Sequence, residues 1–124
     1  MEQKFFICET CGNIIAMVKP SGVPVMCCGQ KMKEIVPNTT DAAQEKHVPV
    51  WTKEGNLVKV QVGSAAHPML AAHYIEWVSL QTKAGNQRKA LAPGQAPEVT
   101  FALTEGDEVE AVYAYCNLHG LWKA

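Results

Sequence analysis

The alternation of apolar and polar residues predicts a chain built mainly of short β-strands. From His47 onward, apolar side chains recur at every second position in short runs, and glycine, asparagine and proline residues separate these runs. The predicted strands cover residues 48–52, 57–62, 74–83, 88–92, 99–103 and 109–115. In the last strand, Val109, Ala111, Tyr113 and Tyr115 are expected to share one face. A set of roughly seven short strands with such turns is typical of an antiparallel β-sandwich.

The first part of the chain has shorter apolar runs and a different organisation. Its predicted strands are Phe5-Phe6-Ile7, 13–18 and 31–36. The segment Pro37-Asn38-Thr39-Thr40-Asp41 is rich in turn-forming residues. Residues 41–46 could form one helical turn, which is too short to be stable alone. We therefore predict a small module at 1–37 and a larger domain at 38–124.

Composition excludes several functional classes. A chain of 124 residues with a formal net charge of -1 lacks the basic surplus of a nucleic-acid-binding protein. Its apolar runs are shorter than a membrane span, and its first residues do not have the form of a signal peptide. We therefore expect a cytoplasmic protein without a nucleic-acid or membrane partner. Its cysteines would be reduced and available to a metal ion.

Four of the cysteines lie in the predicted small module. They form two pairs, Cys8-x-x-Cys11-Gly12 and Cys27-Cys28-Gly29. In the first pair both sulfur atoms can face one ion, because the glycine lets the backbone fold beneath it. The pattern predicts a site with four thiolates, in preference to disulfides or free buried thiols.

The second pair consists of adjacent residues, which affects the geometry of the predicted site. Neighbouring side chains in extended backbone point to opposite faces. Cys27 and Cys28 can therefore share an ion only if the backbone twists between them. The resulting angles should depart from a regular tetrahedron, which favours iron over a regular structural zinc site. The sequence does not exclude zinc.

The larger domain contains a second candidate site. Its elements are the pair Cys116-x-x-His119, closed by Gly120, and the three remaining histidines, His47, His67 and His73. Each lies at the end of a predicted strand or in a loop, where β-sandwiches carry their sites. His67 and His73 can reach one ion only if the chain bends between them, because a regular helix or strand would separate them too far. Pro68 makes such a bend plausible.

The number of candidate ligands indicates the metal. Four imidazoles and one thiolate are too many for a four-coordinate zinc ion. They suit an iron ion with five filled positions and a sixth open to a small ligand. A thiolate opposite that position would donate electron density toward the bound ligand.

These motifs together resemble the desulfoferrodoxin family, the two-iron class of superoxide reductases. The matching stretches are Cys8-x-x-Cys11 with Cys27-Cys28, Glu45-Lys46-His47-Val48-Pro49-Val50, His67-Pro68-Met69 with His73, 93–98, and 116–123. The resemblance implies an all-β protein, with a desulforedoxin- or rubredoxin-like module followed by an immunoglobulin-like sandwich, assembled as a homodimer. Relatives often carry charged residues where this chain has Leu70-Ala71-Ala72.

The resemblance also implies the roles of individual residues. The four histidines would be equatorial ligands of a ferrous ion, with Cys116 axial, and the four-cysteine iron would be an auxiliary electron-transfer centre. The reaction would be the one-electron reduction of superoxide to hydrogen peroxide. Lys46 would attract the anion, and Glu45 would bind the ferric ion after peroxide leaves. Without the resemblance, both residues are ordinary solvated side chains.

The electron donor implied by the family is a rubredoxin-type protein or another reductase. Two other functions remain open from the residues alone. The protein could be a rubredoxin-like electron carrier whose histidines are structural, or a zinc-binding interaction module without catalysis. Visible colour separates the zinc protein from the others, and superoxide consumption separates the reductase from the carrier.

Overall fold

The computed structural model describes residues 2–124. Contacts within the chain divide it into two compact units, Met1–Val36 and Pro37–Ala124. Nearly all regular structure is antiparallel β, and α1 (Gln44–His47) is the one α-helix among the described residues. The all-β prediction is therefore confirmed. No helix within residues 2–124 has the length and apolar character needed to cross a membrane.

The first unit contains a three-stranded sheet and a small hairpin. The sheet has the order β2-β1-β5, and the hairpin pairs β3 with β4. These strands are β1 (Phe5–Ile7), β2 (Ile14–Ala16), β3 (Met26–Cys27), β4 (Gln30–Lys31) and β5 (Lys33–Glu34). The single strand predicted over 31–36 is wrong, because Lys31 pairs within the hairpin whereas Lys33 and Glu34 pair with β1. Met32 lies between the two strands and is buried.

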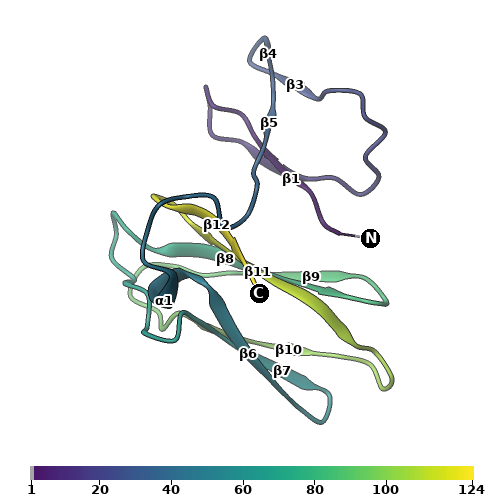
Figure 1. Cartoon of the computed structure of the whole chain (residues 1–124), viewed down its shortest axis with the longest axis vertical. Helices are drawn as coiled ribbons and strands as arrows, with labels where there is room; N and C mark the ends of the chain where they lie inside the picture. Colours follow the sequence, from purple (N-terminus) through teal and green to yellow (C-terminus); the bar gives the residue numbers. More distant parts are fainter. Residues whose placement is uncertain (1) are drawn as a thin grey trace. The chain divides into compact units, whose positions relative to one another are not determined.

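The second unit is a sandwich of two antiparallel sheets, visible as two layers of strands (Figure 1). One sheet has the order β10-β7-β6 and the other β12-β11-β8-β9. The strands are β6 (Pro49–Glu54), β7 (Leu57–Val62), β8 (Ile75–Thr82), β9 (Asn86–Ala90), β10 (Glu98–Ala102), β11 (Val109–Cys116) and β12 (Gly120–Lys123). A hairpin turn was predicted at Glu54-Gly55-Asn56, and the structure joins β6 to β7 there, with Glu54 paired to Leu57.

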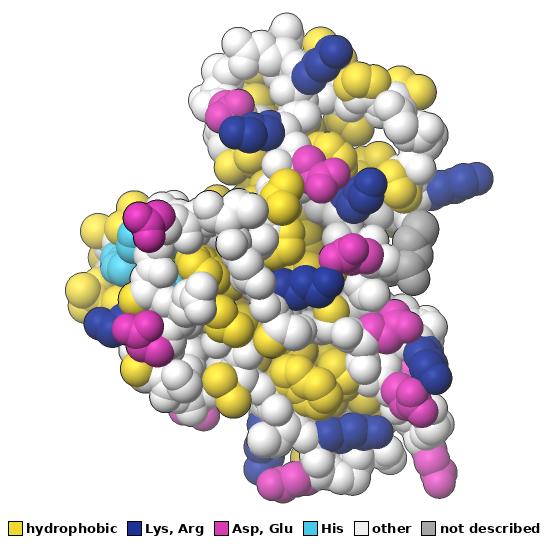
Figure 2. Space-filling view, in the orientation of Figure 1, with side chains coloured by type: hydrophobic (Ala, Val, Ile, Leu, Met, Phe, Trp, Pro, Cys, Tyr) yellow, Lys and Arg dark blue, Asp and Glu magenta, His cyan; other side chains and the backbone are white. Residues whose placement is uncertain are grey.

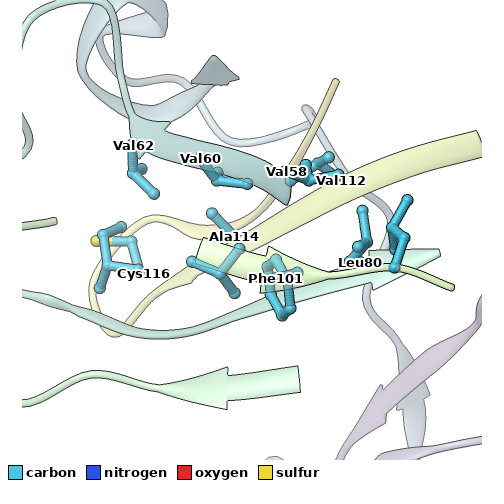
Figure 3. Packing of buried hydrophobic residues seen from close by; sticks show 11 residues of the cluster. Val58, Val60, Val62, Leu80, Phe101, Val112, Ala114 and Cys116 are labelled. Atoms are coloured by element: carbon cyan, nitrogen blue, oxygen red, sulfur yellow. The ribbon is translucent and has the colours of Figure 1, made fainter. Parts of the chain in front are cut away.

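The core of this unit lies between the two sheets. Along β7 every second residue is buried, so Val58, Val60 and Val62 face the core while their neighbours are exposed. The facing sheet contributes Ile75, Val78, Leu80, Val112, Ala114 and Cys116, and β10, the neighbour of β7 in its own sheet, contributes Phe101. Figure 3 shows Cys116 at one end of this packed row. The core therefore extends to the residue that was predicted to bind a metal.

Two features of the second unit differ from the sequence predictions. The pairing of β11 with β8 shifts between Val109 and Ala111, where a β-bulge adds one residue to the strand. Val109 therefore packs against the core cluster, whereas Tyr113 lies under the ammonium group of Lys123 on the other face. The prediction that Val109 and Tyr113 share a face is wrong. Strand β12 was also not predicted, because four residues without alternation carry no strand signal.

Candidate metal centres

The four cysteines of the first unit form one cluster. Cys8 and Cys11 lie in the turn after β1, Cys27 ends β3, and Cys28 lies in the turn before β4. Their sulfur atoms all lie within 4.8 Å of one another. The Sγ atoms of Cys11 and Cys27 are 3.6 Å apart, and those of Cys27 and Cys28 are 4.0 Å apart. A tetrahedral ion with metal–sulfur bonds of about 2.3 Å places neighbouring sulfurs about 3.8 Å apart, so these donors fit one such ion.

Local backbone geometry explains how each pair of thiols converges. The N–H of Gly12 donates to the carbonyl oxygen of Cys8 at 2.8 Å, which closes the first turn. At the adjacent pair, Cys28 has a φ of 53°, a left-handed conformation that is uncommon for a residue other than glycine. This is the backbone twist that two neighbouring cysteines need in order to face the same point.

The electrostatics of the cluster also favour a bound cation. The backbone N–H of Cys11 lowers the pKa of Cys8 to about 6. Contact with the Cys11 side chain raises the pKa of Cys27, and raises that of Cys28 to about 12. Four thiolates cannot ionise together at such distances unless a positive charge compensates them. The cluster is therefore suited to a metal tetrathiolate.

The second site is a ring of four imidazoles. The centroids of neighbouring rings are 4.6 Å apart for His47 and His67, 4.7 Å for His67 and His73, 5.0 Å for His73 and His119, and 4.9 Å for His119 and His47. Across the ring, the centroids of His47 and His73 are 6.4 Å apart. Four nearly equal sides and a longer diagonal describe an approximate square, as expected for four donors around the equator of one ion.

Individual nitrogen atoms point into this ring. The Nε2 atom of His47 lies 3.2 Å from Nε2 of His67 and 3.1 Å from Nδ1 of His119. Two nitrogens at right angles, each about 2.1 Å from an ion, would be about 3.0 Å apart. The Nε2 atom of His73 is buried and has no hydrogen-bond partner. Because a buried polar atom is rarely left unpaired, this nitrogen is suited to bind a metal ion.

Cys116 completes the set from the core side. Its sulfur lies within 4.8 Å of the ligating nitrogens of His47, His67 and His73, and 3.8 Å from Nδ1 of His119. The residue is fully buried in the apolar core (Figure 3). By contrast, His73 and His119 are partly exposed, and histidine atoms reach the surface in Figure 2. The sulfur thus approaches from inside and solvent from outside.

Hydrogen bonds and burial prepare the imidazoles for metal binding. The Nδ1 atom of His47 lies 2.7 Å from the carbonyl oxygen of Ala43, and Nδ1 of His67 lies 2.6 Å from that of Pro68. With Nδ1–H donating to a carbonyl, Nε2 presents its lone pair to the ring centre. Burial is the main reason why the pKa values of His47 and His73 are lowered and that of His67 falls to about 4. These three imidazoles are therefore neutral near pH 7.

The bend predicted between His67 and His73 is present as a tight turn. Leu70 and His73 form an isolated antiparallel bridge with hydrogen bonds of 2.9 and 3.1 Å in the two directions. The turn reverses the chain, so both histidines point to the same place although they lie in one loop.

Two further residues position the ligands. The buried ring of Trp122 stacks on His47 at a centroid distance of 4.9 Å, and its Nε1–H donates to the carbonyl oxygen of His119 at 3.1 Å. The side-chain amide of Asn117 donates to Ala72 at 3.0 Å and accepts from the N–H of Tyr74 at 2.9 Å. It thus holds the backbone on both sides of His73. Neither Trp122 nor Asn117 was predicted to have a role, and the one signal in the sequence was their place in the motif 116–123.

Glu45 and Lys46 lie in α1 immediately before His47, and both are exposed. Burial is the main cause of the lowered pKa of His73, and the charges of His119 and Lys46 contribute to it. Glu45 acts on His47 in the opposite direction, raising a pKa that burial lowers more strongly. Both charged side chains are therefore close enough to influence the imidazole ring.

Comparison with known proteins agrees with this geometry. Residues 39–124 match the family Desulfoferrodoxin, and residues 1–35 match the family Desulfoferrodoxin, N-terminal domain. The desulfoferrodoxin of Nitratidesulfovibrio vulgaris is 46% identical over 123 residues, which cover 99% of this chain and 96% of the relative.

Two solved structures are similar as well. The superoxide reductase from Treponema pallidum has a TM-score of 0.85 and 46% identity, covering 100% of this chain and 99% of its own. The superoxide reductase (1Fe-SOR) from Giardia intestinalis has a TM-score of 0.55 and 34% identity, covering 64% of this chain and 95% of its own. A match over 64% of the chain is longer than the first unit, Met1–Val36, so it includes residues of the second unit.

The two clusters thus occur in a chain whose two parts each match a family model. One cluster has four cysteines, and the other has histidines arranged around Cys116. Both are consistent with the two iron centres of such proteins. With matches that together span nearly every residue, the chain belongs to the desulfoferrodoxin family.

Proposed function

We propose that this protein is a superoxide reductase, which adds one electron and two protons to superoxide and releases hydrogen peroxide. The observation that carries the proposal is the arrangement of five donors in the second unit. A square of imidazoles has a sulfur on its buried side and partly exposed rings on the other. Five donors with one accessible side suit an ion that must meet a small dissolved substrate.

The residues that would hold this ion are His47, His67, His73, His119 and Cys116. A ferrous ion bound there supplies the electron. Burial raises the pKa of the Cys116 thiol, so this group would ionise together with ion binding. As a thiolate on the buried side of the imidazoles, Cys116 would donate electron density to the bound ion.

Lys46 and Glu45 are proposed to act at the accessible side. Superoxide is an anion, and the ammonium group of Lys46 raises its local concentration beside the imidazoles. Glu45 would hold the oxidised ion after the product has left. Their exposure and their electrostatic influence on His47 and His73 support these roles.

The first unit is proposed to hold an auxiliary electron-transfer iron. Cys8, Cys11, Cys27 and Cys28 would fill all four positions of a tetrahedral ion and leave none for superoxide. In this proposal residues 1–37 form the iron-tetrathiolate module, and residues 38–124 form the superoxide reductase domain.

The cellular setting is part of the same proposal. We infer a cytoplasmic homodimer that receives electrons from a rubredoxin-type protein or another reductase and protects the cell from oxidative damage. The family relationship supports these inferences, and the reduced cysteines suit such a compartment.

The test is a stoichiometric measurement with the iron-loaded, pre-reduced protein. Pulse-generated superoxide should oxidise the histidine-site iron and yield one hydrogen peroxide per superoxide consumed, without oxygen release. Oxygen release would indicate a dismutase. Loss of superoxide no faster than in buffer would leave the electron-carrier alternative and reject the proposal.

A further inference from the structure

Gly63 occupies a position where no side chain fits. It follows β7 with a φ of +69°, and a Cβ atom built on it would meet the backbone of the α1 segment. The Cβ would lie 2.4 Å from the carbonyl oxygen of Glu45, 2.5 Å from the carbonyl carbon of Lys46 and 2.6 Å from its Cα. These are backbone atoms, which cannot rotate away as a side chain could. Only glycine therefore permits this approach.

The loop that begins at Gly63 also binds the same peptide. The backbone N–H of Ala65 donates to the carbonyl oxygen of Glu45 at 2.9 Å, and the Ser64 hydroxyl donates to that oxygen at 3.3 Å. The side-chain amide of Gln61 donates to the carbonyl oxygen of Gly63 at 3.1 Å and holds the loop in turn. The segment carrying Glu45 and Lys46 thus packs closely against the Gly63 loop and is hydrogen-bonded to it.

This loop is itself fixed at both ends. It follows the buried strand residue Val62, and the N–H of His67 donates back to the carbonyl oxygen of Val62 at 2.9 Å. The residues 63–65, which contact Glu45 and Lys46, therefore belong to the same closed loop that ends at His67, one of the four imidazoles. A shift of residues 63–65 would change the position of the Lys46 charge relative to the four imidazoles.

The α1 segment needs such external support. It has only four residues, and no side chain caps its N-terminus. A helix of this length is not stable by its own hydrogen bonds, so its position depends on tertiary contacts. Its buried member His47 is one anchor, and the Gly63 loop provides the other at the residues just before it.

We propose that Gly63 is a positioning residue for the reaction with superoxide, acting through Lys46. By lacking a side chain, it lets the loop 63–65 hold the Glu45–Lys46 peptide where the ammonium group steers the anion to the imidazole ring. This inference rests on the proposed function, and it adds a residue that touches neither the substrate nor the ion.

The test compares two glycines that differ in one respect. Gly55 also has a positive φ, +58°, but a Cβ on it would meet nothing within 4 Å. It lies in the turn at the far end of the β6–β7 hairpin. The Gly55→Ala variant therefore reproduces the backbone strain of Gly63→Ala without its steric conflict, and serves as the matched control.

Both variants would be loaded with iron, pre-reduced and mixed with pulse-generated superoxide over a range of ionic strength. Gly63→Ala should lower the second-order rate constant about tenfold at low ionic strength and flatten its salt dependence, while the iron content stays the same. Gly55→Ala should behave as the unmodified protein does. In a double variant with Lys46→Ala, Gly63→Ala should have little further effect, because both changes remove the same steering.

A second readout does not depend on activity. Hydrogen exchange followed by mass spectrometry on the iron-loaded protein should show faster exchange in peptides covering 43–48 and 63–67 for Gly63→Ala, and no change there for Gly55→Ala. If Gly63→Ala fails to fold or to hold iron, Ser64→Ala is the smaller change. It should flatten the salt dependence in part, and Ser64→Thr should restore it because the hydroxyl is retained.

The outcomes separate this inference from the proposed function. Unchanged salt dependence of the rate constant in Gly63→Ala overturns the inference. It is also overturned if the effects of Gly63→Ala and Lys46→Ala on the rate constant are fully additive, or if Lys46→Ala alone keeps the salt dependence of the unmodified protein. If Gly63→Ala does not fold, normal salt dependence in Ser64→Ala overturns it. In each of these cases superoxide reduction by the unmodified protein still stands. An unmodified protein that does not reduce superoxide rejects the proposed function, and with it the kinetic role of Gly63.

Discussion

The Nε2 atom of His47 lies 3.1 Å from the Nδ1 atom of His119, although the two residues are 72 positions apart in the sequence. They present different ring nitrogens to each other, Nε2 from His47 and Nδ1 from His119. His119 lies in the short turn after Cys116. Its Nδ1 atom, the ring nitrogen nearer to the backbone, is 3.8 Å from the Cys116 sulfur. His47 uses Nδ1 to bond Ala43 and therefore offers Nε2. Each histidine is thus oriented by its own local contact.

Removing the His119 imidazole should disable only the second site. The His119→Ala variant loses one of the four imidazoles of the ring, so the reaction with superoxide should be abolished or greatly slowed. The first unit has its own cluster, and its tetrathiolate colour should persist. Metal content, visible spectra and single-turnover kinetics measure these effects. A variant that retains the full rate would show that His119 is not needed as a ligand.

Replacing Cys11 with serine should have the opposite effect. A hydroxyl oxygen is a poorer iron ligand than a thiolate, so Cys11→Ser should weaken or abolish the tetrathiolate centre. The second unit has its own hydrophobic core and should stay folded. After chemical reduction, the variant should still reduce superoxide in one turnover. Loss of that reaction, with the histidine-bound iron still present, would contradict the assignment of the chemistry to the second site.

The Trp122 side chain should contribute to the free energy of unfolding. It is 1% exposed, stacks on His47 and donates to the backbone of His119. Trp122→Ala should lower the free energy of unfolding by about 3–5 kcal/mol, because it leaves a cavity beside the site. Trp122→Phe keeps an aromatic ring and should lose mainly the hydrogen bond, about 1 kcal/mol. Denaturant unfolding of the iron-loaded variants tests this order, and equal losses would mean that the packing of the aromatic ring adds nothing beyond the Nε1–H hydrogen bond.

The side chain of Asn117 should control how firmly His73 is held. Asn117→Asp keeps the shape and the acceptor for the Tyr74 N–H, but places an oxygen against the carbonyl oxygen of Ala72. Outer contacts of this kind typically change metal affinity by about 10- to 100-fold, and we expect a loss of about tenfold here. Titration with a competing chelator measures the affinity of the histidine site, with the tetrathiolate site as internal control. An unchanged affinity would mean that the turn holds His73 without the amide.

Asp107 should make folding stability depend on pH. The Thr82 hydroxyl donates to its carboxylate at 2.6 Å, and the N–H groups of Ala84 and Glu108 donate as well, which lowers the pKa of Asp107. A carboxyl group with a lowered folded-state pKa stabilises the protein above its unfolded-state pKa of about 3.9. That contribution disappears as the pH falls through the lower folded-state value.

Asp107→Asn removes this titration. The difference in unfolding free energy between the unmodified protein and the variant should therefore be largest near neutral pH and shrink in the acid range. Taking the difference cancels the acid-induced loss of metal, which both proteins share. A difference that does not change with pH would show that Asp107 has the same pKa in the folded and in the unfolded chain.

Local patterns in the sequence were sufficient for much of the fold. Alternation predicted the strands from β6 to β11 to within a few residues, because one face of each strand must be apolar to form the core. The β-bulge after Val109, which interrupts the alternation along β11, was not predictable because a bulge depends on the pairing with β8. Strand β12 exists only because Leu121 and Trp122 pair with β11, and its four residues have no strand pattern of their own.

The candidate ligands were also evident from the sequence, because cysteine and histidine carry the metal-binding chemistry in their side chains. Spacing indicated that Cys8 and Cys11 would converge and that the chain must bend between His67 and His73. The ligand roles themselves remain predictions that the experiments above would test, and the division at residue 37 also remains a prediction.

Tertiary structure alone decided the contacts between segments that are distant in the sequence. It brought the α1 segment against Gly63, stacked Trp122 on His47, and set the Asn117 amide across the backbone of His73. These contacts depend on how the two sheets pack, and no local pattern encodes that packing. The sequence by itself determined which groups could bind a metal, whereas the packing of the sandwich determined which atoms meet and from which side solvent reaches them.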